Sequence, residues 1–444
     1  MRFLLLSLAL AAPASAASSR VDYSSFTLSN GLRVLVASDR SLPVVATAFI
    51  ADVGGRHEVP GRSGFAHLFE HLMFEGSKHV PKGGFDRILE SYGGDNNAST
   101  HADFTFYYEN VPSNALPVAL WLDADRLGGL DVSQHAVKTQ IEVVKEEKRM
   151  RIDNEPYGPV LYDGMAAATF KNWQSAHSIM GSFEDLEAAS LKDVREFFEA
   201  YYSPDNVVMA VAGDIGHDEA LRLAQDYFGA IKPKARPKAP DTSEPASSSE
   251  STVKSTDQHA KLPALCVTWK GMPERSSADY YALSLLGRAL LSGKSAALYQ
   301  SLVKGAQVAV SVDGGLGFPL SDWDEYKAPA AFGAFIVHKR DAAPAKVREL
   351  VAAEVARVAK EGLTAAELER VKVKFRSDWF RGQETRLGRA QRLLYSALLD
   401  GDAEEANRRL DKFMAVTADD IRRAAAALKP EAATWFEVAA GGAQ

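Results

Sequence analysis

Cysteine is almost absent from this sequence, because Cys266 is the only one among 444 residues. A single cysteine excludes an intramolecular disulfide and a metal site made of cysteines alone, so any metal ion must be held by His, Asp or Glu. Basic residues are not in excess either, since 51 Lys and Arg face 58 Asp and Glu and the net charge is −7. This balance argues against a nucleic-acid-binding protein, which should carry a basic patch.

Long apolar runs are also missing. Beyond the N-terminus no segment is apolar enough to span a bilayer, so we predict no membrane-spanning helix. The N-terminus reads Met1-Arg2, then a short apolar run over residues 3–12, then Ala14-Ser15-Ala16. This pattern is typical of a secretory signal peptide, residues 1–16, and predicts an exported protein, periplasmic or secreted. An uncleaved buried strand or a membrane anchor is the alternative.

The remaining composition, 46% hydrophobic and 25% charged, is that of a globular chain. A stretch rich in Pro and Ser predicts a linker over residues 236–262 between domains at 17–235 and 263–444. A helix-and-strand unit that opens at Ser190 recurs at Thr417, and both copies carry an acidic residue in the first helical turn. Because adjacent strands are followed by groups of helices, we predict an α+β fold with two related halves.

Residues 63–76 carry the most informative pattern. Apolar side chains recur there at helical spacing, with Ser63 available to cap the start and Gly76 to end the helix. His67, Glu70 and His71 form a second stripe on the opposite side. One turn separates the two histidines, so both imidazoles can reach one ion. The apolar stripe consists of Phe65, Leu68, Phe69, Leu72 and Met73.

Zinc hydrolases use this arrangement. Two neutral imidazoles and a third protein ligand hold the ion and leave one position for water, and a nearby carboxylate takes a proton from that water. His-x-x-Glu-His is the inverted form of the common zinc-protease motif. A solvated polar face on an amphipathic helix is the alternative, although a metal ion would satisfy two histidines and a glutamate that are partly covered.

A third ligand must come from elsewhere in the chain. In the charged segment 140–149, Glu147 follows Val143 and Val144 by four and three residues, so it continues the buried stripe of the predicted helix. Glu146 follows Glu142 by four residues and falls on the charged side. Periodicity therefore favours Glu147 over Glu146, while an ordinary surface glutamate remains the alternative.

The sequence resembles the pitrilysin, insulysin and mitochondrial-processing-peptidase family of zinc metallopeptidases. His67-x-x-Glu70-His71, with Glu147 after 75 intervening residues, carries the resemblance. Other family-like segments are Asn30-Gly31-Leu32-Arg33-Val34, Gly93-Gly94-x-Asn96-Asn97-Ala98-Ser99-Thr100 with Asp103-x-Thr105, Tyr201-Tyr202-Ser203-Pro204-Asp205-Asn206, and Leu291-Ser292-Gly293-Lys294-Ser295.

The resemblance implies two related α+β halves that close, with a second chain or a fused copy, like a clam shell around a chamber. It implies that His67, His71 and Glu147 hold one zinc ion per chain and that Glu70 is the general base that activates water. It also implies that Asn97 and Ala98 lie on the strand whose edge pairs with the backbone of a substrate peptide.

Two departures from the family pattern matter. Many members carry a glutamate seven residues before the third ligand, where this chain has Gln140. An amide can still hydrogen-bond a ligand from behind, but it changes the local charge. Many members also show an Arg and a Tyr in the second half, where this chain reads Gln307-Val308-Ala309-Val310, and residues 279–291 contain neither His nor Glu. The second half therefore cannot bind this metal, and we hypothesise a homodimer or a heterodimer with a related chain that lacks the zinc motif.

These features predict an exported zinc endopeptidase that hydrolyses peptides or unfolded segments, with Glu70 activating the water. A non-hydrolytic subunit of a peptidase complex, or a protein that captures peptides without turnover, is the alternative. Catalytically inactive relatives usually lose residues of the zinc motif, whereas the two histidines and two glutamates of the motif are all present here.

Overall fold

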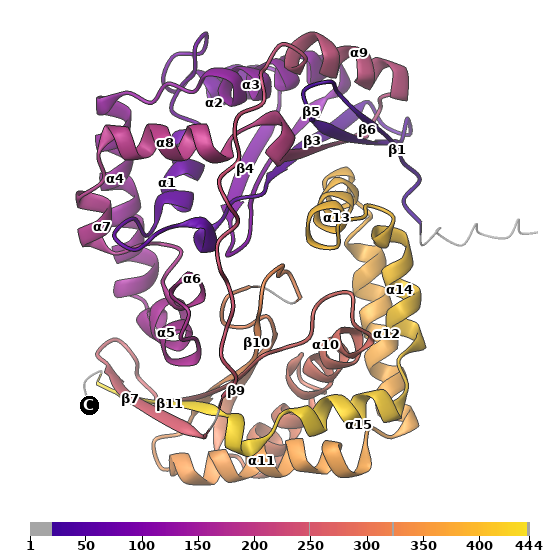
Figure 1. The fold of residues 1–444 in the computed structure, drawn as a ribbon. Helices are drawn as coiled ribbons and strands as arrows, with labels where there is room; N and C mark the ends of the chain where they lie inside the picture. Colours follow the sequence, from indigo (N-terminus) through magenta and orange to yellow (C-terminus); the bar gives the residue numbers. More distant parts are fainter. Residues whose placement is uncertain (1–19, 248, 322–323, 442–444) are drawn as a thin grey trace, which may run out of the picture.

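Two β-sheets, each covered by helices, form the two halves of the chain (Figure 1). The structure is a computed structural model that describes residues 20–247, 249–321 and 324–441. The predicted signal peptide, residues 1–16, lies outside the described residues. A long extended segment runs from α9 (His217–Phe228) in the first half to β7 (Ser251–Asp257) in the second.

The first sheet has six strands in the spatial order β1-β2-β6-β3-β5-β4. β2 and β6 pair in parallel, and all other neighbours are antiparallel. Strand β4 has a partner on one side only, so it is a free edge of the sheet. The strands are β1 Ser24–Thr27, β2 Arg33–Ser38, β3 Val44–Ala51, β4 Asp95–Thr100, β5 Thr105–Pro112 and β6 Val207–Gly213.

The second sheet has five strands in the order β7-β11-β8-β10-β9. β7 and β11 pair in parallel and the others are antiparallel. If β1 is left out, the first sheet has the same strand order as the second. In each sheet the parallel pair then joins the first and the last strand along the chain, β2 with β6 and β7 with β11. The prediction of an α+β fold with two related halves is confirmed. The remaining strands are β8 Ala264–Lys270, β9 Ala309–Leu316, β10 Ala331–His338 and β11 Thr434–Ala440.

Helices surround both sheets. Those of the first half are α1 Phe65–Leu72, α2 Gly84–Ser91, α3 Leu116–Gly129, α4 Gln134–Lys148, α5 Met165–Thr169, α6 Trp173–Ala176, α7 Phe183–Glu187, α8 Leu191–Tyr201 and α9. Those of the second half are α10 Ala278–Leu291, α11 Pro344–Glu361, α12 Ala365–Arg381, α13 Arg386–Leu399, α14 Glu405–Ala415 and α15 Ala418–Ala427. No helix in the described ranges combines the length and the apolar character needed to cross a bilayer.

The repeated helix-and-strand unit has the same start in both halves. Ser190 caps α8 and pairs reciprocally with Asp193, and Thr417 caps α15 and pairs in the same way with Asp420. Each cap satisfies backbone N–H groups at the beginning of its helix and places a carboxylate at the positive end of the helix dipole. The strands that follow, β6 and β11, pair in parallel with β2 and β7, respectively.

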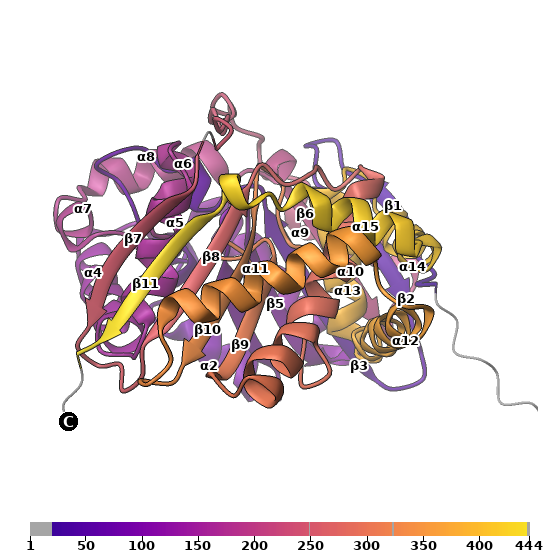
Figure 2. The same cartoon turned by 90° about the horizontal axis from the view of Figure 1, so that it is seen from below.

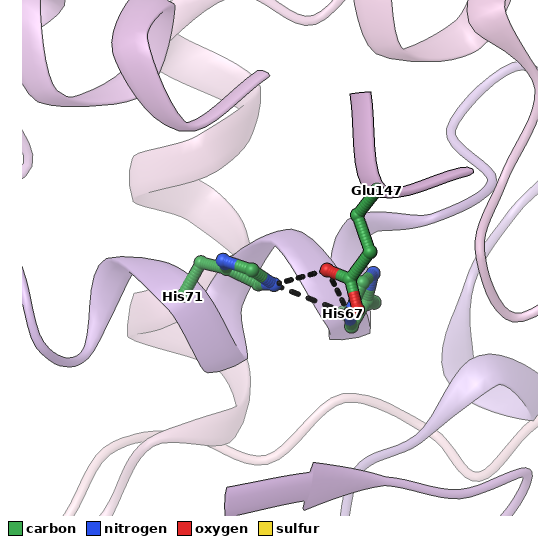
Figure 3. Close-up of side chains that lie close together, drawn as sticks. All are labelled: His67, His71 and Glu147. Carbon is green, nitrogen blue, oxygen red and sulfur yellow. Dashed lines mark hydrogen bonds and ion pairs between the residues drawn. The ribbon is translucent and has the colours of Figure 1, made fainter. Parts of the chain in front are cut away.

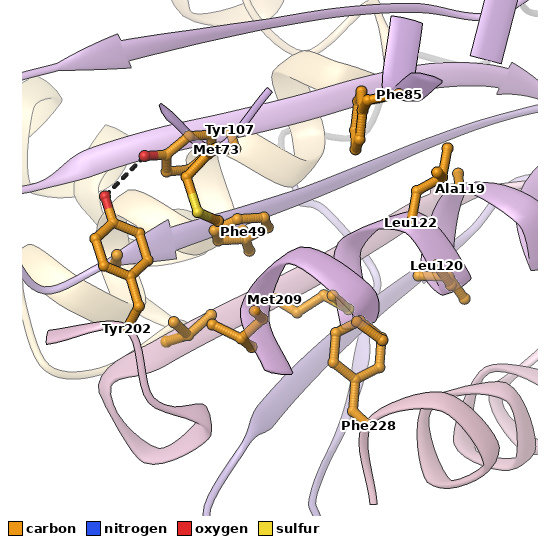
Figure 4. Close-up of a cluster of buried hydrophobic side chains, with 14 of the residues drawn as sticks. Phe49, Met73, Phe85, Tyr107, Ala119, Leu120, Leu122, Tyr202, Met209 and Phe228 are labelled. Carbon is orange, nitrogen blue, oxygen red and sulfur yellow. Dashed lines mark hydrogen bonds between the residues drawn. The ribbon is translucent and has the colours of Figure 1, made fainter. Parts of the chain in front are cut away.

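The main core of the first half lies between the sheet and α1, α3, α4, α8 and α9. In this core Phe49 of β3 stacks on Tyr107 of β5, whose hydroxyl lies 2.7 Å from that of Tyr202 (Figure 4). The second half has a matching core between its sheet and α10, α11 and α15. Seen from below, α11 runs across the second sheet, and α15 lies beside α10 and α11 (Figure 2).

Each half contributes helical residues that pack on the sheet of the other half. Helix α13 of the second half packs on the face of the first sheet opposite the main core, where its residues Ala390, Leu393 and Leu394 join a shared apolar cluster. In return, the π-helical turn at Val160–Gly164 and α5 of the first half pack on the second sheet beside Cys266 and Phe335. Both faces of each sheet are therefore covered, which explains why β3 and β6 are apolar along nearly their whole length.

The predicted linker, residues 236–262, needs correction. Its residues 251–257 form β7, which pairs along its length with β11 and belongs to the second sheet. Glu244 fastens the preceding extended part, because its carboxylate accepts hydrogen bonds from the backbone of Lys171 and Asn172 and from the Lys270 ammonium group. A composition rich in Ser and Thr does not prevent an edge strand when backbone pairing is available.

Candidate metal centre

Helix α1 carries the zinc-like motif and buries its apolar stripe in the first core. Phe65, Leu68, Phe69, Leu72 and Met73 are all almost fully buried. Phe69 stacks on Phe197 and Tyr202, and these contacts fix the roll of the helix about its axis. The opposite stripe, with His67, Glu70 and His71, consequently faces α4 and the edge strand β4.

The start of α1 differs from the prediction. Ser63 does not cap the helix, because its hydroxyl donates to Asp185 instead. The buried carboxylate of Glu58 accepts the N–H groups of Gly64 and Ala66, each at 2.8 Å, so it supplies the negative charge at the helix N-terminus. Gly64 has a φ of 84°, and a Cβ there would lie 2.9 Å from the Met180 carbonyl oxygen. Glycine is required at this position for both reasons.

The structure brings His67, His71 and Glu147 together (Figure 3). His71 Nε2 lies 3.2 Å from His67 Nε2 and 3.1 Å from Glu147 Oε2. The third side of this triangle, from His67 Nε2 to Glu147 Oε2, measures 3.6 Å. Within the described part of the chain, this is the one group of three or more His, Cys, Asp or Glu side chains that can hold a metal ion together.

These distances fit a tetrahedral zinc ion. With ligand bonds of about 2.0–2.1 Å, two ligand atoms of a tetrahedral site lie about 3.3 Å apart. The three measured distances lie on both sides of this value. Two nitrogen donors and one oxygen donor are also the ligand types that zinc takes in hydrolytic sites, where a fourth position stays open.

Electrostatics favour the neutral form of His67. Burial and the neighbouring His71 ring lower the pKa of His67 to about 4. A neutral imidazole has a lone pair to donate, as a metal ligand must. The hydrogen bond with His71 lowers the pKa of Glu147, so its carboxylate is ionised at neutral pH. The ligand set thus needs no loss of a proton from His67 or Glu147 to receive a cation.

Helix α4 places Glu147 in the cluster and Glu146 outside it. Glu146 is exposed and pairs with Arg149, while Glu147 points toward the histidines. The second carboxylate oxygen of Glu147 forms an ion pair with Arg151 Nη1 at 3.0 Å. Each Glu147 oxygen therefore has a different partner, which restricts rotation of the carboxylate.

Glu70 lies on the same stripe, between the two histidines in sequence. Its Oε2 accepts a hydrogen bond of 2.6 Å from the hydroxyl of Thr100, the last residue of β4. Burial raises the pKa of Glu70 above the ordinary value. A carboxylate in such surroundings is suited to accept a proton near neutral pH.

Asn97 and Ala98 lie in the middle of the edge strand β4. Both pair with β5 on one side, and the other side of the strand has no partner strand among the described residues. Asn97 is exposed and Ala98 is partly buried. The position of the two residues is that of a strand able to receive an added peptide strand.

Gln140 lies away from the ligands. Its Nε2 donates to Glu75 Oε1 at 2.6 Å, beyond the C-terminal end of α1. Gln140 therefore hydrogen-bonds Glu75, in the segment after α1, and not one of the proposed metal ligands as expected. The bond joins α4 to the end of α1, which fixes the spacing of the two helices that carry the cluster.

Three contacts of the site are absent from the sequence prediction: Glu58 at the start of α1, Thr100 on Glu70, and Arg151 on Glu147. The Arg151 contact has a local signal, since the two residues are four apart on one helical face. The contacts of Glu58 and Thr100 join residues from different elements, and no spacing in the sequence predicts them. Glu58 is held in turn by His177 Nε2 at 2.8 Å.

Two family profiles match the chain: insulinase (peptidase family M16) over residues 33–182 and peptidase M16 inactive domain over residues 188–375. The chain belongs to the M16 peptidase family, which confirms the resemblance seen in the sequence. The first profile spans the whole cluster, and the second spans most of the second half.

Individual relatives agree. The chain is 32% identical to zinc protease PqqE of Helicobacter pylori over 65% of this chain and 65% of that protein, so just under two thirds of that relative is matched. It is 27% identical to an uncharacterised zinc protease of Streptomyces coelicolor over 90% of this chain and 85% of the relative. A crystal structure of a protease from Helicobacter pylori superposes with a TM-score of 0.87 at 26% identity, covering 94% of this chain and all of the other.

Proposed function

We propose that this chain is a zinc-dependent endopeptidase that hydrolyses peptides or unfolded segments. The observation that carries the proposal is the triangle of His67, His71 and Glu147 donor atoms, with sides of 3.1–3.6 Å, beside the partly buried carboxylate of Glu70. The family relation and the names of the relatives agree with it.

In this proposal His67, His71 and Glu147 hold one zinc ion. When bound, the ion supplies a Lewis acid that lowers the pKa of water and polarises a peptide carbonyl. Glu70 accepts a proton from the attacking water and later gives it to the leaving amine. Arg151 keeps Glu147 in its ligating orientation, and the Gln140–Glu75 hydrogen bond keeps α4 at its distance from α1.

The free edge of β4 supports extended peptide segments as the class of substrate. A peptide added beside Asn97 and Ala98 would pair through its backbone, so the enzyme would accept extended segments with little side-chain preference. Folded proteins would be excluded, because their strands are already paired. This agrees with peptides and unfolded segments as substrates.

Two further parts of the proposal concern place and partners. The sequence of residues 1–16 supports export, to the periplasm or out of the cell. The second half supports a need for a partner, since α10, which mirrors α1, contains neither His nor Glu. We expect a homodimer or a heterodimer with a related chain without the zinc motif, which native mass spectrometry of the complex from its source distinguishes.

The central test combines metal analysis with cleavage of a quenched fluorescent peptide. Glu70→Gln should abolish cleavage and keep about one zinc per chain, whereas Glu147→Gln should lose the zinc as well. Glu146→Gln is the matched control, because it changes the exposed neighbour, and it should keep both. Peptide binding without cleavage by the zinc-loaded wild type would instead support a peptide-capturing subunit, and undiminished cleavage by Glu70→Gln would reject Glu70 as the base.

A further inference from the structure

The hydroxyl of Thr100 lies within hydrogen-bond distance of the carboxylate of Glu70. Its Oγ1 donates to Glu70 Oε2 at 2.6 Å, a distance typical of a strong bond to a charged acceptor. The hydroxyl of Thr100 therefore holds one oxygen of this carboxylate.

The position of Thr100 is fixed by the sheet. It is the last residue of β4 and pairs with Thr105 of β5, whose own hydroxyl donates to the Val53 carbonyl. Successive side chains of a strand point to opposite faces, and the Ser99 hydroxyl accordingly bonds His101 instead of Glu70. A β-branched side chain has few accessible χ1 rotamers, so the Thr100 hydroxyl is held toward α1.

The same strand is the one expected to receive the substrate. Asn97 and Ala98 precede Thr100 by three and two residues on the free edge. A peptide that pairs with β4 would end its ladder close to the residue that holds Glu70. Strand β4 thereby connects the place where the backbone of the peptide binds to the group that takes the proton.

We propose that Thr100 is a positioning residue that orients the Glu70 carboxylate toward the attacking water. The inference rests on the proposed peptidase function, and it adds a residue that acts through Glu70 without touching the reacting atoms. Loss of the hydroxyl frees the carboxylate to rotate. Catalytic turnover should fall, while zinc and peptide binding persist, because the ligands and the backbone of β4 remain.

The test compares Thr100→Val, Thr100→Ser and Ser99→Ala in the zinc-loaded, peptide-cleaving preparation. Val keeps the shape of Thr and removes the hydroxyl, so kcat should fall between about 10- and 100-fold with KM within about twofold, since a small misplacement of a catalytic group has effects of this size. Ser restores the hydroxyl and should recover most of kcat. Ser99→Ala changes the opposite face of the strand and should leave kcat and KM unchanged.

A second measurement does not depend on activity. Crystal structures of the zinc-loaded wild type and Thr100→Val should show one Glu70 conformer in the first and a rotated or divided carboxylate in the second, with equal zinc content. Wild-type kcat in Thr100→Val, or an unmoved Glu70 with Ser failing to rescue, would overturn the proposal. Failure of the zinc-loaded wild type to cleave any peptide would instead overturn the proposed function itself, so the two failures are distinguishable.

Discussion

Asp103 should be among the costliest charged residues to replace in this chain. It lies between β4 and β5 and is 4% exposed, and Arg56, which is 1% exposed, donates to both its oxygens at 2.9 and 3.0 Å. The backbone N–H of Lys327, in the second half, donates to the same carboxylate at 2.8 Å. Asp103→Leu therefore leaves a buried guanidinium and a backbone N–H without their acceptor.

The expected cost follows from this burial. Removing one partner of a buried ion pair destabilises a protein by about 3–5 kcal/mol, because the other charge stays buried without compensation. Arg56→Met combined with Asp103→Leu removes both charges, so the loss should shrink to about 1–3 kcal/mol, the cost of leaving unpaired the Lys327 N–H and the Pro329 carbonyl, which accepts from Arg56. The double variant should consequently be more stable than the single one.

A neighbouring ion pair provides the control. Lys327 Nζ also pairs with Asp52 at 2.7 Å, but there the two side chains are 42% and 23% exposed. Asp52→Leu should cost only about 0–1 kcal/mol, since water screens the pair. Urea unfolding followed by tryptophan fluorescence measures all four proteins. Equal costs for Asp103→Leu and Asp52→Leu, or a double variant less stable than Asp103→Leu, would refute the reasoning.

Three other predictions concern the core, acid stability and the metal. Phe69→Ala should lower the free energy of unfolding by about 3–5 kcal/mol in urea melts, because it removes a buried ring of α1 that stacks on Phe197 and leaves a cavity. A loss under 1 kcal/mol contradicts this prediction. The Ser41 hydroxyl, with Arg389, holds the pKa of Asp39 well below its usual range, so this stabilisation is present at neutral pH and disappears as pH falls below the ordinary pKa. Urea midpoints of Asp39→Asn should therefore fall less between pH 6 and pH 3 than those of the wild type, and equal slopes reject the claim. Chelation should lower the melting temperature and added zinc should restore it. Free zinc at 100 times its Kd should raise the free energy of unfolding by about 2.7 kcal/mol, whereas Glu147→Gln should respond to neither treatment.

Local periodicity predicted much of the site. The spacing of Phe65, Leu68 and Leu72 indicated which side of α1 is buried, and the opposite side then had to carry both histidines. The same reasoning separated Glu147 from Glu146 on α4, although of the two valines on which it rested Val144 is buried and Val143 is exposed. The halves were also visible, since the capped units at Ser190 and Thr417 recur with the same local chemistry.

Other elements had no local signal. Strand β4 reads Asp-Asn-Asn-Ala-Ser-Thr, without apolar alternation, and is a strand because β5 pairs with it. Strand β7 is largely exposed and lies in a Ser-rich segment that resembled a linker. The exchange of α13 and α5 between the halves was equally hidden, because an apolar helix face does not specify which sheet it will cover.

The sequence by itself determined the chemistry available: two imidazoles one turn apart, a carboxylate between them and another on a distant helix. Only the tertiary structure decided that Glu147 reaches the histidines, that Thr100 holds Glu70 and that Glu58 caps the helix. The physical reason is range. Helical spacing fixes neighbours within about four residues, whereas contacts between distant segments exist only after whole elements have packed and their backbones have taken a common register.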